Sequence, residues 1–216
     1  MQALSYTQEY YLCASNGKRN LYSTDVACLL AGGIAELRAH GYITRAEKDK
    51  LVAGKPWDGA LPYLAPLYEV IVSLKRPQTA GEIAVNYSGK ATKQLIAALG
   101  DSLVIAGCAD ETSKKGLLGE KTVYVPDEQA VKQAVNKIRA AFLESESMVD
   151  GQALYLAALL ESGGLIRNYF SKFEADTMKK RIKELRKSEA YASIRETLDE
   201  LEEHIAAIVV IIAAST

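Results

Sequence analysis

The stretch that decides the fold is Ser193–Ala214, SIRETLDELEEHIAAIVVIIAA. Ser193 and Glu196 have the spacing of a capping box, in which each side chain accepts from a free backbone N–H, so a helix is predicted to start there. The first half is amphipathic, with apolar residues at helical spacing and acidic residues on the other face. The apolar residues are Ile194, Leu198, Leu201 and Ile205, and the acidic residues are Asp199, Glu200, Glu202 and Glu203.

The second half of this stretch, from Ile205 to Ala214, is apolar on every side. A helix needs about 20 such residues to span a membrane, and this run has half that length. We therefore expect the helix tip to lie in the middle of a globular core, with other helices packed around it and with Val209 and Ile211 fully buried. A C-terminal membrane anchor is the alternative.

Composition places the chain among soluble globular proteins. It has 216 residues, of which 49% are hydrophobic and 25% charged, so a sizeable core can form. Because no stretch rich in Pro, Gly and Ser divides the chain and no repeat is visible, residues 1–216 are predicted to form a single domain. The formal net charge of -1 argues against broad electrostatic binding to nucleic acid and leaves only local basic patches.

The cysteines and the N-terminal segment both suggest a cytoplasmic location. Cys13, Cys28 and Cys108 are odd in number and far apart, which favours reduced thiols in a cytosolic compartment. Residues 2–8 are polar and no long apolar run follows them, so no signal peptide is expected.

The first long helix is predicted after Ser23-Thr24-Asp25, a cluster of good N-caps. Gly32-Gly33 lies within its apolar stripe and costs stability unless a neighbouring helix packs closely there. His40-Gly41 is predicted to end the helix, with His40 in a capping role that suits the helix dipole. Thr44 and Glu47 form a second capping box, which predicts a short helix up to Val52.

The middle of the chain has the order of a winged helix. Thr79 and Glu82 predict a short helix, a turn follows at Ser88-Gly89, and Ala91–Leu99 is predicted as a second helix. Two strand-like runs, 103–105 and 122–125, then suggest a β-hairpin. An alternative function is therefore a nucleic-acid-binding regulator that uses residues 79–125. Its predicted recognition helix offers only Lys93, with Lys90 just before it, which argues against contacts to phosphates and bases.

The rest of the chain is predicted to be helical, with further helices starting at Asp127, Asp150 and Asp176. The expected fold class is thus mainly α: one compact multi-helical domain around a buried apolar C-terminal helix, with one protruding β-hairpin.

The sequence does not contain a recognisable catalytic constellation. Two histidines, both expected on helix surfaces, do not suggest a histidine-based triad or a metal site. Gly32-Gly33 lies within a helix rather than after a strand, so it is not a phosphate-binding loop. We therefore expect no catalytic residues, no metal and no cofactor, and a protein that is not an enzyme.

Two features could serve in binding. The basic helix around Lys179–Lys187 is interpreted as a solvated face balanced by the acidic residues at 199–203. The predicted hairpin loop carries Lys114, Lys115, Leu117 and Leu118, and exposed leucines beside lysines suit a membrane interface or a partner subunit. The alternative for these leucines is that both fold back onto the core.

The order of these elements and their residues resembles the Golgi phosphoprotein 3 family over essentially the whole chain. The segments that carry the resemblance are LSYTQEYYL at 4–12, AGGIAEL at 31–37, GYI at 41–43, LVI at 103–105 with the hairpin, KRIKEL at 180–185 and the apolar C-terminal helix. The resemblance implies a mostly helical domain around a buried apolar helix. It also implies peripheral attachment to the cytosolic face of membranes by binding phosphatidylinositol 4-phosphate, and in eukaryotes an adaptor role towards the cytoplasmic tails of glycosyltransferases.

The resemblance also indicates where the lipid pocket of eukaryotic members falls in this chain. Its Trp falls at Leu21 or Tyr22, its first Arg at about Leu30, and its two later Arg near Gly89 and Thr92. The nearest basic residues to the last two positions are Lys90 and Lys93. We predict a shallow anion-binding patch formed by Arg19, Tyr22, Lys90 and Lys93. Two predicted helix N-termini, after Thr24-Asp25 and after Ser88, lie near these residues and present free N–H groups and a positive dipole end to an anion.

The expected partners follow from these features. They are an anionic lipid headgroup or membrane surface, a second copy of the chain bound through the hairpin, and the cytoplasmic tails of other proteins. Nucleic acid is not expected as a partner.

Overall fold

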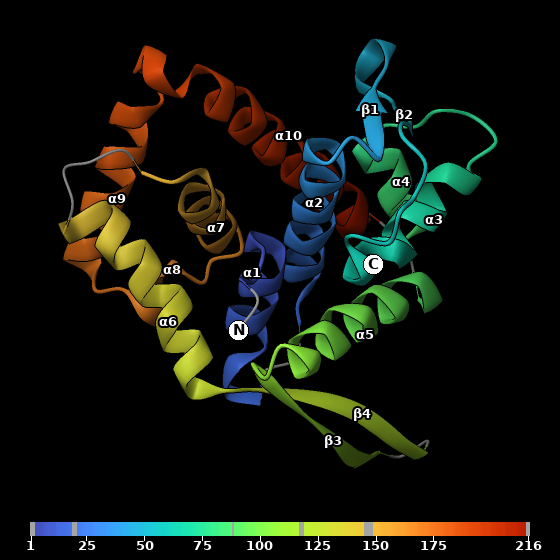
Figure 1. Ribbon diagram of the computed structural model, residues 1–216, viewed down its shortest axis with the longest axis horizontal. Helices are drawn as coiled ribbons and strands as arrows, with labels where there is room; N and C mark the ends of the chain where they lie inside the picture. The colour runs from blue at the N-terminus through green and yellow to red at the C-terminus, as the bar shows by residue number, and fades with distance from the viewer. Residues whose placement is uncertain (1–2, 19–20, 88, 117–118, 145–148, 215–216) are drawn as a thin grey trace.

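The computed structural model describes residues 3–18, 21–87, 89–116, 119–144 and 149–214. The described residues are mainly α-helical, with two small antiparallel hairpins (Figure 1), as the sequence predicts. The helices are α1 (Tyr6–Ser15), α2 (Ser23–Ala39), α3 (Ala65–Ser73), α4 (Ala80–Asn86), α5 (Lys90–Ile105), α6 (Glu128–Arg139), α7 (Gly151–Ser162), α8 (Ile166–Tyr169), α9 (Lys172–Leu185) and α10 (Ala192–Ala214). The strands are β1 (Ile43–Arg45), β2 (Leu51–Ala53), β3 (Ala109–Gly116) and β4 (Gly119–Pro126).

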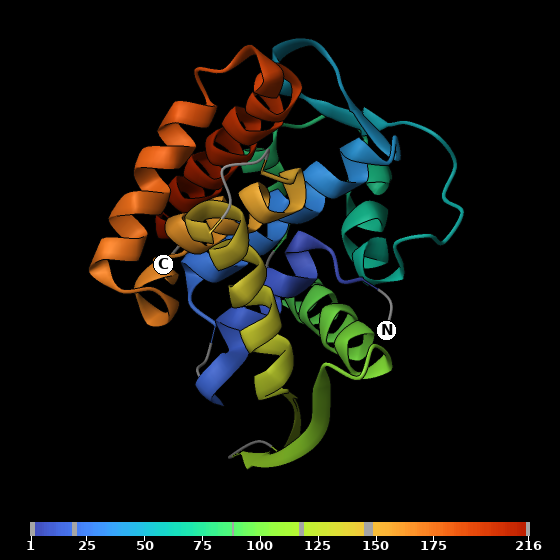
Figure 2. The same cartoon turned by 60° about the vertical axis from the view of Figure 1, so that its left-hand side comes forward.

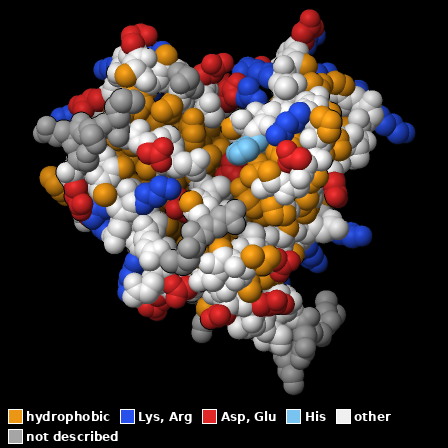
Figure 3. All heavy atoms as spheres, in the orientation of Figure 1, with side chains coloured by type: hydrophobic (Ala, Val, Ile, Leu, Met, Phe, Trp, Pro, Cys, Tyr) orange, Lys and Arg blue, Asp and Glu red, His pale blue; other side chains and the backbone are white. Residues whose placement is uncertain are grey.

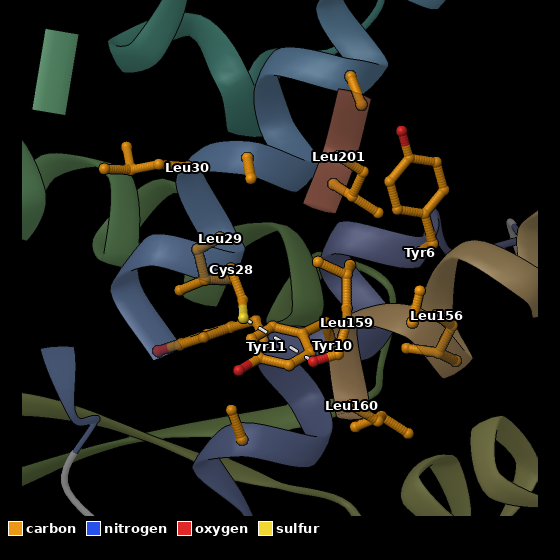
Figure 4. Close-up of a cluster of buried hydrophobic side chains, with 14 of the residues drawn as sticks. Tyr6, Tyr10, Tyr11, Cys28, Leu29, Leu30, Leu156, Leu159, Leu160 and Leu201 are labelled. Carbon is orange, nitrogen blue, oxygen red and sulfur yellow. Dashed lines mark hydrogen bonds between the residues drawn. The ribbon is translucent and has the colours of Figure 1, made fainter. Parts of the chain in front are cut away.

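The helix at the centre of the molecule is α1, not the C-terminal helix. All ten residues of α1 are buried, and Ser5 and Gln8 close a capping box at its start. Figures 1 and 2 show α1 enclosed by α2, α5, α6 and α7. Its tyrosines pack against leucines of α7 and against Leu29 and Cys28 of α2 (Figure 4). The Cys28 thiol there donates to the Leu159 carbonyl at 3.8 Å.

The Gly32-Gly33 pair lets α1 and α3 pack closely against α2, in agreement with the prediction that a neighbouring helix packs there. A Cβ at Gly32 would lie 2.8 Å from Thr7 Oγ1 on α1. A Cβ at Gly33 would lie 2.7 Å from Leu67 Cδ2 on α3. Both separations are far shorter than van der Waals contact, so larger residues here would force the neighbouring elements away from α2.

Helix α10 covers the core from one side. Leu198, Leu201, Ile205 and Ile208 are buried against α2, α4 and α7. The prediction that the apolar tip is buried all round is wrong: Val209 and Ile211 are only partly buried, and Val210 is 67% exposed. The reason is that the position at the centre of the helices is already filled by α1. Within the described residues, the structure has no helix long and apolar enough to cross a membrane.

The helix predicted from Thr44 and Glu47 is wrong, because this segment is a small hairpin. Strand β1 pairs with β2 in register from Ile43 opposite Ala53 to Arg45 opposite Leu51. Lys48 and Asp49 in the connection have φ of 57° and 58°, a left-handed conformation that interrupts any α-helix. Burial of Ile43 and Leu51 favours the hairpin over the local capping signal.

The second hairpin is confirmed, but its first strand is shifted along the chain. Residues 103–105 form the last turn of α5, which ends where Gly107 takes φ 69° and Cys108 N–H bonds back to the Leu103 carbonyl. Strand β3 follows and pairs with β4, from Ala109 opposite Pro126 to Gly116 opposite Gly119. The sequence of β3, ADETSKKG, has no apolar alternation to reveal a strand.

The later helices start largely where their caps predict. Asp127 caps α6 and Asp150 precedes α7. Helix α9 starts at Lys172, four residues before the predicted Asp176, because Ser171 and Glu174 form a capping box. Its lysines extend into solvent, and Arg186, just after it, pairs with Asp199 and Glu202, in agreement with the balanced-face interpretation.

Candidate functional site

The start of α2 presents one predicted site residue to solvent. Tyr22 is the N-cap residue of α2 and its side chain is 60% exposed. The adjoining helix N-terminus, however, already faces a carboxylate. Buried Asp25 accepts from the Tyr22 backbone N–H at 2.7 Å and from the Tyr10 hydroxyl at 3.1 Å. The predicted contribution of this helix end to anion binding is therefore weakened by Asp25. Arg19 lies outside the described residues.

The start of α5 is the more positive helix end. Lys90 is its first residue and Lys93 lies one turn later, and both side chains are exposed. The N-cap is Gly89, with φ 57° and ψ -100°, which has no side chain to cap the helix, and the first turn contains no acidic residue. Free N–H groups, the helix dipole and two ammonium groups therefore act in the same direction and favour an anion there.

The family positions of the lipid pocket carry different chemistry in this chain. Leu30, at the position of the helix Arg, is 1% exposed and lies in the core, where Figure 4 labels it on α2. Thr92 uses its hydroxyl to donate to the Tyr87 carbonyl at 2.9 Å and so tightens the turn before α5. Among the described residues of the predicted patch, Lys90 and Lys93 lie together at the start of α5, whereas Tyr22 belongs to the start of a different helix, α2.

The second predicted surface is the end of the β3–β4 hairpin. The hairpin projects from the helical body in Figures 1 and 2. Lys114 and Lys115 belong to β3 near its end, opposite Lys121 and Glu120, whereas Leu117 and Leu118 lie outside the described residues. The base of the hairpin is anchored, because the Tyr124 hydroxyl on β4 donates to the Asp101 carboxylate on α5 at 2.7 Å.

Charge is mixed over the rest of the visible surface. In Figure 3, Lys and Arg side chains lie interspersed with Asp and Glu side chains across one face. This agrees with the formal net charge of -1 and makes the local arrangement at α5 more informative than the overall charge.

The comparison with known families identifies the fold family. The sequence profile of Golgi phosphoprotein 3 (GPP34) matches residues 7–201. The chain belongs to the Golgi phosphoprotein 3 family. The match extends from α1 into the first half of α10 and confirms the resemblance stated above. No curated protein matches the chain.

Sequence reasoning missed one further group of charged residues in this Golgi phosphoprotein 3 family member. It lies where the end of α2, strand β1 and helix α10 meet, and consists of Arg38, Arg45, Glu200 and His204. Glu200 was expected on a solvated acidic face and His204 on a helix surface. Instead Glu200 is buried and His204 is partly buried. The spacing of Glu200 and His204, one turn apart on one helix face, was the only sequence signal that pointed to the group.

Proposed function

We propose that this protein is a peripheral, membrane-associated adaptor that binds anionic lipid headgroups through Arg19, Tyr22, Lys90 and Lys93. The observation that supports the proposal is the positive start of α5, where a glycine N-cap is followed by Lys90 and Lys93 and by no acidic residue in the first turn. These lysines lie beside the positions that hold two arginines in the family's lipid pocket, and family membership makes phosphatidylinositol 4-phosphate the first headgroup to test.

The selectivity of this protein for one lipid headgroup is expected to be lower than that of eukaryotic relatives. Lys supplies a point charge, whereas Arg offers a planar fork that grips two oxygens of one phosphate. A site built on two lysines therefore favours negative charge in general over one particular headgroup. Membrane contact, self-association through the hairpin and binding of cytoplasmic protein tails belong to the same proposal, with the protein on the cytosolic face of a membrane.

The alternative function in nucleic-acid binding has little support. Helix α5 carries Lys90 and Lys93 in its first turn but has no basic residue along the rest of its length. The strand that follows it, β3, carries the acidic pair Asp110-Glu111 directly after its first residue, Ala109. A recognition helix needs several basic or amide side chains that reach phosphates and base edges.

The proposal is tested by vesicle sedimentation with the Lys90→Glu/Lys93→Glu variant. Vesicles of phosphatidylcholine alone, with phosphatidylserine, and with phosphatidylinositol 4-phosphate are compared at low and moderate salt. Binding of the wild-type protein to both anionic vesicles should fall with salt, since exposed charges are screened over about 8–10 Å at physiological ionic strength. The variant should bind weakly at both salt concentrations.

The matched control is Lys180→Glu/Lys183→Glu, which makes the same charge change at exposed positions of α9. This variant should retain binding if the α5 patch is the site. Equal binding by the wild-type protein and the Lys90→Glu/Lys93→Glu variant would refute the patch. Equal losses of vesicle binding in both variants would mean that binding depends on the overall charge of the protein and not on the α5 patch.

A further inference from the structure

One buried carboxylate is shared by two arginines where α2, β1 and α10 meet. Glu200 on α10 is 7% exposed and pairs through one oxygen with Arg38 at the end of α2. Its other oxygen accepts from Arg45 Nη1 on β1 at 2.7 Å. Arg45 also donates through Nε to Asp49 at 2.8 Å. Three elements distant in sequence thus bring two guanidinium groups to one carboxylate.

Two polar atoms in this group are buried and have no hydrogen-bond partner within the described residues. They are Arg38 Nε and His204 Nδ1. His204 follows Glu200 by one helical turn, so both side chains project from the same face of α10. A buried N–H without a partner loses its hydration and gains nothing in return, and the usual explanation is a bound water or ion.

The charges that act on His204 leave a positive field at its imidazole. Arg38 is the less exposed arginine, with 24% of its side chain exposed, whereas Arg45, 39% exposed, is shared between Glu200 and the 60% exposed Asp49. The field of this group acts on His204: burial, Arg38 and Arg45 lower the pKa of the imidazole, and Asp49 opposes them. An anion would offset this field, and a cation would add to it.

We propose that this group binds a phosphate-type oxyanion, which accepts hydrogen bonds from Arg38 Nε–H and from the His204 imidazole. The site is separate from the lipid patch. Tyr22 and Arg38 lie at opposite ends of α2, roughly 24 Å apart at 1.5 Å per residue. The oxyanion is a soluble phosphate group or the phosphate of a lipid headgroup, and both offer the same oxygens to these donors.

Binding of the anion is coupled to a proton on His204. The imidazole must carry a hydrogen on Nδ1 to donate from that atom, and the protonated form does so while adding a positive charge. The charged groups that act on the pKa of His204 are Arg38 on α2, Arg45 on β1 and Asp49 after β1. Glu200 pairs with both arginines, and Glu196 acts on Arg38. Phosphate, present there as the monoanion, should therefore bind more tightly as the pH falls through the range in which His204 gains its proton.

The test uses NMR signals of the imidazoles in the full-length protein during titration with inorganic phosphate, against sodium chloride at matched ionic strength. The chain has two histidines, and His40, whose Nδ1 lies 2.9 Å from the Glu36 carbonyl, serves as the internal control. Phosphate, but not chloride, should shift the His204 signals and raise its pKa towards the ordinary value. Unchanged His204 signals would overturn the proposal and leave a bound water as the partner of the two atoms.

The variant Arg38→Lys isolates the Arg38 Nε–H donor. Lys keeps a positive charge for Glu200 but lacks the guanidinium edge, so phosphate affinity should fall about tenfold or more while thermal unfolding shows a folded protein. Unchanged phosphate affinity would remove Arg38 from the site. If Arg38→Lys misfolds, the wild-type NMR titration alone still decides the proposal.

Vesicle binding distinguishes the two sources of the phosphate group. Wild type and Arg38→Lys are compared on vesicles with phosphatidylserine and with phosphatidylinositol 4-phosphate. Equal vesicle binding, together with lost phosphate affinity, assigns a soluble phosphate group to the site. Loss of both vesicle binding and phosphate affinity assigns the phosphate of a lipid headgroup to the site. Because the Lys90→Glu/Lys93→Glu variant leaves this group intact, it should retain the phosphate response of His204 whether or not the lipid patch exists.

Discussion

The Tyr63 hydroxyl donates a 2.8 Å hydrogen bond to the carboxylate of Glu36, and both residues are buried. The other oxygen of Glu36 accepts from the Thr7 backbone N–H at 3.0 Å. One carboxylate on α2 therefore ties α1 to the segment before α3. Burial raises the pKa of Glu36, and the hydrogen bonds from Thr7 and Tyr63 oppose that rise.

Removal of the Tyr63 hydroxyl should destabilise the protein. Tyr63→Phe leaves a buried carboxylate oxygen without its donor, so the free energy of unfolding should fall by roughly 1–3 kcal/mol. Urea unfolding measures the change. Tyr68→Phe is the control, because the Tyr68 hydroxyl forms no hydrogen bond within the described part of the chain, and it should stay within about 0.5 kcal/mol of wild type. Similar losses in both variants would contradict this role for the Tyr63–Glu36 bond.

Local signals in the sequence predicted part of this fold well. The Thr79–Glu82 capping box starts α4, Asp127 caps α6, and the Gly32-Gly33 pair meets close neighbours. Each of these depends on residues near in sequence or on a packing demand that glycine makes visible.

The features that could not be predicted from the sequence depend on tertiary contacts. Helix α1 carries the polar residues Gln8 and Glu9, yet both are buried, because the Ser102 hydroxyl accepts from the Gln8 amide and Lys137 donates to the Glu9 carboxylate. The position of α1 therefore leaves no place at the centre for the tip of α10. Apolar periodicity cannot reveal a helix whose polar residues are satisfied by distant partners.

The two candidate sites also differ in how far the sequence could predict them. Lys90 and Lys93 could be placed at a helix start from the turn before them, although the exact start moved by one residue. The spacing of Glu200 and His204 places both on one helix face, but their arginine partners could not be found from the sequence, because Arg45 and Glu200 are 155 residues apart. Which arginine meets which carboxylate is decided by how α10 crosses the end of α2.

The stability of the protein should fall in mild acid because of His204. Burial, Arg38 and Arg45 lower the pKa of His204 to about 4, from an ordinary value of 6.5. The unfolded chain therefore binds the proton first, so stability is fully present above about pH 6.5 and declines as the pH falls towards about 4. The loss attributable to this group is on the order of 3 kcal/mol.

Unfolding free energies of wild type and His204→Gln, measured across this pH range in buffers without phosphate, test the effect. The His204→Gln curve should be flatter between about pH 6.5 and about pH 4. His40→Gln should keep the slope of the wild-type protein. A His204→Gln variant with the full wild-type slope would assign the acid loss to other groups.

The two sides of α10 should respond differently to the same charged substitution. Ile208 is fully buried, so Ile208→Asp places a carboxylate in the core at a cost of several kcal/mol, comparable with a typical total stability of about 5–15 kcal/mol. Val210 is 67% exposed, and Val210→Asp should stay within about 0.5 kcal/mol of wild type. Size-exclusion chromatography and thermal unfolding measure both. An unfolded Val210→Asp variant would favour a tip buried all round.

The hairpin leucines should act in association and not in folding. The double change Leu117→Asp/Leu118→Asp should lower oligomer mass or vesicle binding and leave the melting temperature nearly unchanged, if both leucines are exposed as the sequence predicts, because such residues beside lysines suit an interface. Ile105→Asp is the control, because Ile105 is 87% exposed at the end of α5, near the hairpin base. A large drop in melting temperature for the double variant would mean that the leucines pack on the core.

The attachment of this hairpin to the body depends on a glycine in α5. A Cβ at Gly100 would overlap the ring of Tyr124 on β4, and the Tyr124 hydroxyl is held by Asp101 at 2.7 Å. An ordinary helical Gly→Ala change gains up to about 1 kcal/mol, but here Gly100→Ala must displace the ring, at a cost of roughly 1–3 kcal/mol. In the Tyr124→Ala background the ring is gone, so Gly100→Ala should become neutral or stabilising. Urea unfolding of the four proteins in this double-mutant cycle gives the coupling energy. A stabilising Gly100→Ala change in the wild-type background would show that the ring does not pack on Gly100, and the orientation of the hairpin against α5 would then have to differ.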